Sequence, residues 1–319
     1  MRLRKDDGKT FQFGWLLLSV LAVTFQVAAS EEDERPEAAA RPARTGWSVS
    51  TEGGYLYQME SDIDDGGSFS LQRAYGGLGL TYSWERLRSA TLALGYGFDE
   101  YTFSGDDGFG GLEPWEDVHS VRLSAPLRYA FNSQWTGFAV PVLRSSAEDA
   151  SDFDEALSGG GFLGASYRFN DRLTLGPGLG YITQIEDDPS VFPVLLVNWK
   201  IAEDLSLTTG RGVAATLGPG LFLNWRARPD WNVAFGGRLD KFRFRLDDKG
   251  DAPHGVGEDW SFPLLLAVSY TRNRRFTAGL AAGVKFGGEL RLEDDDGGRL
   301  AEDGYDAVPF VGVSLRFQF

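Results

Sequence analysis

The sequence contains no cysteine and has only two histidines and two methionines among its 319 residues. Without cysteine, the chain forms no disulfide and offers no thiolate to a metal ion. His119 and His254 are the only imidazole groups available for acid–base catalysis or metal binding. Chemistry that needs a cysteine nucleophile or a histidine cluster is therefore excluded.

Positive charge is also scarce. The chain has 31 Lys and Arg residues against 46 Asp and Glu residues, which gives a formal net charge of −15 at pH 7. An acidic protein repels the phosphate backbone, so nucleic acid is not an expected partner.

A long apolar run occurs only near the N-terminus, over residues 15–23. Basic residues precede it (Arg2, Arg4, Lys5 and Lys9), and small residues follow it at 27–30. These three parts predict a cleaved secretory signal peptide over residues 1–30. The polar, Pro- and Ala-rich residues 31–45 are predicted to form a disordered spacer, with a short plug inside a barrel as the alternative.

What the sequence has in abundance is glycine, with 41 residues, and aromatic residues, at 13%. This composition favours strands and turns over helices. From Trp47 to the end, alternating stretches dominate; in 121–131, for example, Val121, Leu123 and Leu127 oppose Arg122 and Arg128. A period of two predicts β-strands that each have one apolar face and one polar face.

Short turns and long loops separate these stretches in strict succession. Short turns are predicted at 85–89, 132–134, 170–172, 202–204, 228–230 and 272–274. Long loops are predicted near 60–68, 104–117, 144–157, 185–190, 209–216, 246–259 and 293–306, and they contain 29 of the 46 acidic residues. Thirteen connections predict fourteen strands; twelve is the alternative, because 205–226 is short for two strands and a loop.

Six of the nine tryptophans lie beside the short turns or at the start of the first strand: Trp47, Trp84, Trp135, Trp199, Trp225 and Trp231. A ring of tryptophan at one level is typical of a membrane interface, and a soluble sandwich has no need of one. Residues 46–319 are therefore predicted to form an all-β, transmembrane, antiparallel up-and-down β-barrel. Its short turns are expected in the periplasm and its long acidic loops outside the cell.

The chain ends on an alternating strand, 308–319, with Phe317 and Phe319 in step with Leu315. Because a barrel has no edge, this strand should pair with the first one, near 46–59. With its signal peptide and turn pattern, the chain resembles Gram-negative outer-membrane β-barrel proteins, most closely porin-like barrels of unknown function. The resemblance implies that Phe319 and Phe317 form the signal read by the barrel assembly machinery.

The polar faces of the strands predict which side chains line the lumen, since a charge facing lipid costs roughly 2–4 kcal/mol at the midplane. The charged candidates are Arg122, Arg128, Arg168, Arg238, Asp240, Lys285, Glu289, Arg291 and Arg316. These side chains either line an aqueous passage or pair across a plugged lumen, and the sequence leaves both open.

Two weaker patterns suggest chemistry. A hydrolase would use His119 with Ser120 or Ser124 and Asp117, or His254 with Asp251 or Asp259. Neighbouring strand residues face opposite sides, which disfavours the pair His119 and Ser120. No catalytic residue, cofactor or metal site is expected. The acidic stretches 61–67 and 293–298 are candidates for divalent cations, although neither has the spacing of a calcium loop.

These observations favour a porin-like passive channel for small hydrophilic solutes, because fourteen strands lie between filled eight-stranded barrels and open pores of sixteen to eighteen strands. The alternative is a structural or surface-interaction barrel that works through its acidic loops. An outer-membrane hydrolase is third. Outer-membrane lipid, lipopolysaccharide and the assembly machinery are the expected partners.

Overall fold

The computed structural model describes residues 45–149, 151, 153–209 and 220–319. The predicted signal peptide, the spacer up to residue 44 and the loop predicted at 209–216, beyond Thr209, lie outside the described residues. The described residues form one sheet of seventeen strand segments and a short helix, α1 (Gly108–Leu112). No helix in these ranges is long and apolar enough to cross a membrane.

The first nine strand segments are β1 (Gly46–Asp62), β2 (Ser68–Glu85), β3 (Arg88–Ser104), β4 (Asp117–Ser124), β5 (Leu127–Ala130), β6 (Trp135–Glu148), β7 (Leu157–Asn170), β8 (Leu173–Gln184) and β9 (Asp187–Lys200). The other eight are β10 (Leu205–Thr209), β11 (Gly220–Arg228), β12 (Trp231–Arg238), β13 (Asp240–Arg245), β14 (Val256–Arg272), β15 (Phe276–Glu293), β16 (Arg299–Tyr305) and β17 (Val308–Gln318).

Three strands of the wall are interrupted, so seventeen segments make fourteen wall strands. The interruptions separate β4 from β5 at 125–126, β12 from β13 at Leu239, and β16 from β17 at 306–307. Two prolines lie at the interruption between β4 and β5: Pro126 within it and Pro141 opposite it in β6. Their carbonyls still accept hydrogen bonds, from the amides of Thr91 and Ala125 respectively. The predicted count of fourteen strands is confirmed.

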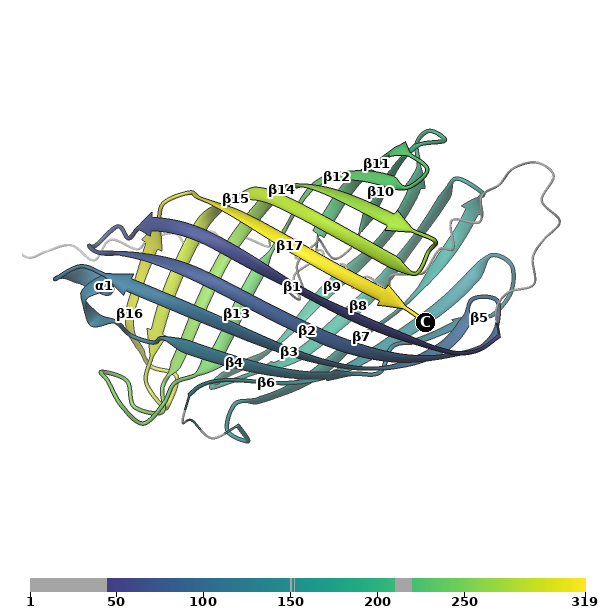
Figure 1. The fold of residues 1–319 in the computed structure, drawn as a ribbon. Coiled ribbons are helices and arrows are strands. Elements are labelled where there is room, and N and C mark those ends of the chain that lie inside the picture. Colours follow the sequence, from purple (N-terminus) through teal and green to yellow (C-terminus); the bar gives the residue numbers. More distant parts are fainter. Residues whose placement is uncertain (1–44, 150, 152, 210–219) are drawn as a thin grey trace, which may run out of the picture.

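The sheet closes between its first and last strands. β1 and β17 are antiparallel, with nine register pairs from Ser50 and Gln318 to Gln58 and Phe310. Val49 and Phe319 extend the ladder by two backbone hydrogen bonds of 3.2 and 2.8 Å. β17 lies beside β1, and the C-terminus lies at the end of the barrel with the short turns (Figure 1). Closure pairs the backbone groups of both edge strands, as a bilayer requires.

The outer surface of the barrel carries an apolar belt between two levels of exposed aromatic residues. The level at the end with the short turns, here the short-turn end, contains Trp47, Trp135, Trp199, Trp225, Trp231 and Phe319. The level nearer the opposite, long-loop end contains Tyr55, Tyr57, Tyr96, Tyr181, Phe262 and Phe286. Between them lie exposed leucines such as Leu80, Leu94 and Leu280. This arrangement matches the two interfaces and the hydrocarbon core of a membrane.

Beyond the second aromatic level the strands continue, but the two faces exchange polarity. In β3, Leu94 and Tyr96 face outward, whereas Gly95 and Gly97 face the lumen. Past Asp99 the inward residues are the buried Tyr101 and Phe103, and the outward ones are Glu100 and Thr102. The alternation is unbroken, so the outer face changes from apolar to polar where the strand leaves the lipid for water.

The part of the barrel beyond this level has its own hydrophobic core and is here called the cap. The buried side chains of the cap core are Ile63, Phe69, Leu71, Tyr101, Phe103, Phe109, Trp115, Val118, Phe242, Phe244, Leu246, Ala252, Leu290, Leu292, Tyr305 and Val308. The Trp115 and Phe244 rings meet edge to face at 5.3 Å, and those of Phe69 and Tyr305 at 4.9 Å. Contacts between opposite walls therefore fill the lumen at this end.

The cap is narrower than the membrane part of the barrel because β13 leaves the wall. Past Leu239, β13 pairs with β14 on one side and reaches across to β6 on the other, through one parallel bridge between Arg245 and Ala147. A bridge between Ile63 and Tyr305 joins β1 to β16. The cap is thus a ring of nine strands: β1, β2, β3, β4, β6, β13, β14, β15 and β16.

Two expectations about this end were wrong. The long loop predicted at 185–190 is a tight turn between Gln184 and Asp187, in which Glu186 adopts a positive φ of 47°. In β15 the alternation shifts by one residue at Gly287, whose φ is +56°. This bulge turns Leu290 and Leu292 into the cap core, although the sequence pattern placed them on the lipid face with Phe286.

Candidate functional site

The lumen toward the short-turn end is lined by hydroxyl and amide groups. Its inward side chains include Ser50, Thr81, Thr91, Thr136, Ser166, Thr174, Asn198, Thr208, Asn224, Asn232, Ser269, Thr277 and Ser314. Several bond across neighbouring strands: Thr81 and Thr91 lie 2.8 Å apart, and Asn224 Nδ2 donates to Thr208 Oγ1 at 2.9 Å. We call this part the vestibule. Its partly exposed polar lining is suited to water and hydrophilic solutes.

Four of the predicted lumen arginines lie on the inner wall of the membrane part. Arg128 and Arg168 project from β5 and β7, and they interact as like charges. Arg316 in β17 is the register partner of Glu52 in β1. Arg122 lines a small cavity of about 80 Å³ together with Arg144, Glu52 and Phe242.

Above the vestibule, six charged side chains from six strand segments form a buried layer. Its members are Arg73 (β2), Asp99 (β3), Arg238 (β12), Asp240 (β13), Asp259 (β14) and Lys285 (β15). The predicted lumen residues Arg238, Asp240 and Lys285 thus lie together in this charged layer.

Ion pairs connect the charged layer across the lumen. The Arg73 guanidinium bonds to Asp99 on the neighbouring strand and lies 3.7 Å from Asp240 Oδ2 on the opposite wall. Asp240 is also 3.4 Å from Arg238 Nη2. Arg73 and Arg144 stand over the Phe242 ring at 5.4 and 4.6 Å. Because one aspartate serves two arginines, removal of its charge would take away the carboxylate that pairs with Arg238 and leave Arg73 with Asp99 alone.

Asp259 joins the charged layer to the cap core. Its carboxylate accepts hydrogen bonds from Tyr101 Oη at 3.2 Å and Tyr305 Oη at 2.9 Å, and Lys285 Nζ lies 3.7 Å away. Burial, followed by the charge of Asp259, raises the pKa of both phenols well above its usual value. The phenols therefore stay neutral and donate to the carboxylate across the physiological pH range.

A second polar cluster fastens the cap to the rest of the barrel where β13 crosses to β6; we call it the seam. Arg243 Nε donates to the carbonyl of Ile185 at 2.7 Å, and the Arg243 guanidinium pairs with Glu258 and Glu293. Arg245 pairs with Glu186 and donates to the carbonyls of Glu155 and His254. Two arginines thus hold the tips of β6–β7 and β8–β9 against the cap.

Glu289 and Arg291 do not face the lumen, contrary to the sequence prediction. They follow the bulge at Gly287 and lie on the face opposite Leu290 and Leu292. There Arg291 pairs with Glu289 at 2.9 Å and with Glu302 at 2.8 Å, on the outer surface of the cap. The bulge carries no strong sequence signal, since Gly287 and Gly288 resemble the many other glycines of the strands.

The candidate hydrolase residues are not brought together. His119 faces outward, where its Nδ1 lies 2.5 Å from Tyr96 Oη and its Nε2 2.7 Å from Asp149. Ser120 faces inward and bonds to Ser146. His254 lies in an exposed loop, whereas Asp259 is buried in the charged layer. Neither arrangement places a base beside a nucleophile within hydrogen-bond reach.

The acidic loops show no preformed metal site within the described ranges, where no group of three histidine or acidic side chains is placed to hold an ion. In the β15–β16 loop the Asp294 carboxylate instead accepts the amides of Asp296 and Gly298, at 3.1 and 2.6 Å. Divalent cations at these loops remain a prediction.

Sequence reasoning missed half of the charged layer and the cap core. Arg73, Phe69 and Leu71 share the parity of the inward Tyr75, Gly77 and Gly79, so the period of β2 identified their face. They lie in the strand predicted after the loop at 60–68, and they were missed because no change of polarity along the inward face was expected. The crossing of β13 has no such signal, since it is a tertiary contact.

The fold that these observations define is that of outer-membrane β-barrel proteins. No protein-family model matches the chain, and no curated protein sequence is detectably similar to it. Solved structures of similar fold include an outer-membrane channel from Pseudomonas putida F1, with 12% identity over 89% of this chain and 99% of that one and a TM-score of 0.44.

A Pseudomonas aeruginosa FadL homologue has 12% identity, coverage of 86% and 89%, and a TM-score of 0.45. The KdgM porin, solved in complex with oligogalacturonate, has 8% identity, coverage of 84% and 99%, and a TM-score of 0.36. With TM-scores this low, these similarities carry no argument about what this barrel transports.

The charged layer predicts a marked difference between two carboxylate replacements. Asp240→Asn leaves Arg73 and Arg238 buried without a carboxylate at their shared position, so it should lower the free energy of unfolding by about 3–5 kcal/mol. Glu302→Gln removes an exposed partner of Arg291 and Arg299 and should cost less than about 1 kcal/mol. Urea unfolding of the refolded protein measures both; equal effects would refute the layer as a structural element.

Proposed function

We propose that this protein is an outer-membrane channel for small hydrophilic solutes whose outer end is closed by the cap in the state described here. The observation that carries the proposal is the polarity of the vestibule. Hydroxyl, amide and guanidinium groups line the inner wall at the short-turn end, and two buried apolar clusters, around Phe138 and around Phe222, lie between this part and the charged layer. A purely structural barrel has no need of such a polar mouth.

In this proposal, solutes can pass through the barrel only when the cap moves out of the lumen. The charged layer and the cap core fill the lumen beyond the vestibule, so passage requires the cap to move. The seam is a weak connection of the cap, because β13 joins β6 through one bridge pair while β14 and β15 share an extended ladder. Opening at the seam would leave the lipid-facing belt and the closure between β1 and β17 intact.

The location and assembly of the barrel are part of the same proposal. Residues 1–30 act as a cleaved signal peptide, and the short-turn end faces the periplasm. Phe319 and Phe317, at the end of β17, are read by the barrel assembly machinery; both are exposed on the lipid-facing surface. The acidic outer loops contact lipopolysaccharide through divalent cations. An enzymatic function is not proposed, because its candidate residues do not converge.

A second candidate function is a surface-interaction barrel that works through the cap. It is favoured by the extent of ordered structure outside the lipid belt: the cap has a filled aromatic core, and its outer face carries polar rows such as Arg291, Glu289 and Glu302. A folded body of this kind presents a stable surface to a partner, which mobile loops do not.

Conductance in a planar bilayer separates the two functions. The wild type should show rare or small openings, and Arg243→Ser with Arg245→Ser should increase open probability because the seam loses its attachment. The control, Lys249→Ser with Arg299→Ser, removes the same charge from the cap outside the seam contacts. A wild type that conducts permanently would contradict closure by the cap. If no variant conducts at any voltage, the result would favour the interaction barrel.

Protease sites inserted into the protein, and tested on intact cells, determine which end of the barrel faces outward. Sites at 294–298, in the β15–β16 loop, should be cleaved from outside, whereas sites at 272–274, between β14 and β15, should be protected until the outer membrane is permeabilised. Cleavage at both positions in intact cells would reject the proposed topology.

A further inference from the structure

The short-turn end is basic, although the whole chain is acidic. Its six turns and the strand ends that flank them contain nine basic side chains: Arg86, Arg88, Arg172, Lys200, Arg226, Arg228, Arg272, Arg274 and Arg275. They contain five acidic ones: Glu85, Asp171, Glu203, Asp204 and Asp230. Arg128 and Arg168 add positive charge on the adjoining inner wall, whereas Arg316 lies opposite Glu52. The mouth of the vestibule is therefore attractive to anions.

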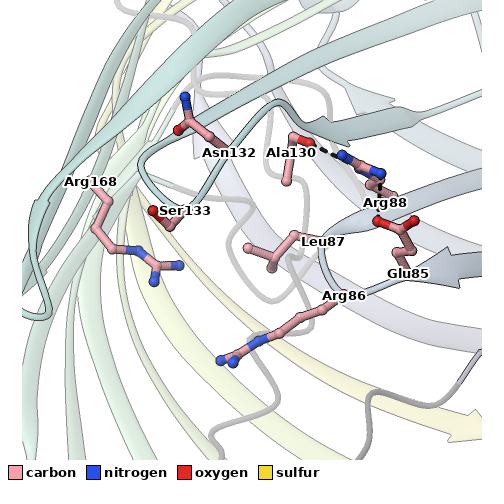
Figure 2. Close-up of a pocket in the computed structure, with 8 residues that line it drawn as sticks. All are labelled: Glu85, Arg86, Leu87, Arg88, Ala130, Asn132, Ser133 and Arg168. Carbon is pink, nitrogen blue, oxygen red and sulfur yellow. Dashed lines mark hydrogen bonds and ion pairs between the residues drawn. The ribbon is translucent and has the colours of Figure 1, made fainter.

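A cavity of about 290 Å³ concentrates this charge at one place on the mouth. It lies between the β2–β3 turn, the β5–β6 turn and the inner face of β7, and it is lined by Arg86, Arg168, Asn132 and Ser133 among others. Figure 2 shows Arg86 and Arg168 extending from different elements into the space beside Ser133. Its volume is close to the lower end of small-molecule pockets, about 300 Å³.

Two positive charges at or beside the cavity, those of Arg168 and Arg128, are not paired with a carboxylate of the described residues. Glu85, the carboxylate that lines it, is paired with Arg88, whose Nε donates to the carbonyl of Ala130. Within the described residues the side chains of Arg128 and Arg168 form no hydrogen bond or ion pair, and they repel each other. Two neighbouring guanidinium groups on one inner wall thus lack a carboxylate.

Neutral polar side chains accompany these arginines. Asn132 uses its Oδ1 to accept the amides of Gln134 and Trp135, at 2.9 and 2.8 Å, which closes the β5–β6 turn. The Nδ2 group of Asn132 points away from Arg168 and Arg86 (Figure 2), so Asn132 shapes the cavity wall by closing the turn. The Ser133 hydroxyl lies on the cavity wall beside it.

We propose that this cavity is a binding site for a small oxyanion, a carboxylate or phosphate group. Arg168 is its principal ligand, Arg86 and Arg128 supply the surrounding field, and the Ser133 hydroxyl donates a hydrogen bond. A planar guanidinium binds carboxylate and phosphate oxygens in a bidentate manner, and an anion here relieves the repulsion between Arg128 and Arg168. The inference does not depend on conduction, because the cavity lies at the mouth, below the charged layer.

Calorimetric titration of the full mature chain, refolded in zwitterionic detergent at low salt, tests the site with inorganic phosphate and with succinate as probes. The wild type should bind at least one probe saturably, and the stronger one identifies whether phosphate or carboxylate is the preferred group. Arg168→Gln should weaken binding about tenfold or more, as expected for loss of a charged hydrogen-bond donor. Arg86→Gln, in an exposed turn, should weaken it by a smaller factor and serves if Arg168→Gln fails to fold.

The matched control is Arg228→Gln, which removes one positive charge from the β11–β12 turn outside the cavity. It should leave affinity within about twofold, since exposed charges at a distance are screened by solvent and salt. Equal weakening by the cavity variants and Arg228→Gln would mean that anions are attracted only diffusely, and this would overturn the proposal. So would the absence of saturable binding of both probes to the wild type.

Discussion

The constraint on which the rest of this structure depends is that one set of strands passes through two solvents. Inside the bilayer, every backbone group must be paired within the sheet and the outward face must be apolar. Beyond the bilayer, the same strands meet water and need a polar outer face and an apolar interior. In β3 both demands are met without a change of register, since the inward series Gly95, Gly97, Asp99, Tyr101 and Phe103 changes from small to charged to aromatic.

The charged layer follows from this inversion, because it occupies the level where the two interiors meet. Its charges are paired with one another, which allows them to lie buried beside the aromatic core of the cap. Asp259 contacts both interiors: its carboxylate accepts hydrogen bonds from two tyrosines of the cap core and lies beside Lys285 of the inner wall. The layer thus connects the architecture of the cap to the electrostatics of the lumen.

Sequence patterns identified the barrel, its closure and its number of strands, because these follow from a period of two and from turn chemistry, which are local. They also located Arg238, Asp240 and Lys285 on the inward parity. They misplaced Glu289 and Arg291, because one extra residue at Gly287 exchanges the two faces of everything that follows in β15. The departure of β13 from the wall toward β6 was beyond sequence reasoning, since a contact between residues as distant as Arg245 and Ala147 leaves no local pattern.

A barrel that is polar and basic at one mouth and closed by an ordered cap at the other combines features of a channel with those of a folded surface domain. The most direct test of this account is the amide hydrogen exchange of the refolded protein in micelles. If the cap has a packed core, the amides of Tyr101, Phe103, Phe244 and Leu290 should exchange as slowly as those of the lipid-facing strands. Rapid exchange throughout these residues, as in mobile loops, would contradict it.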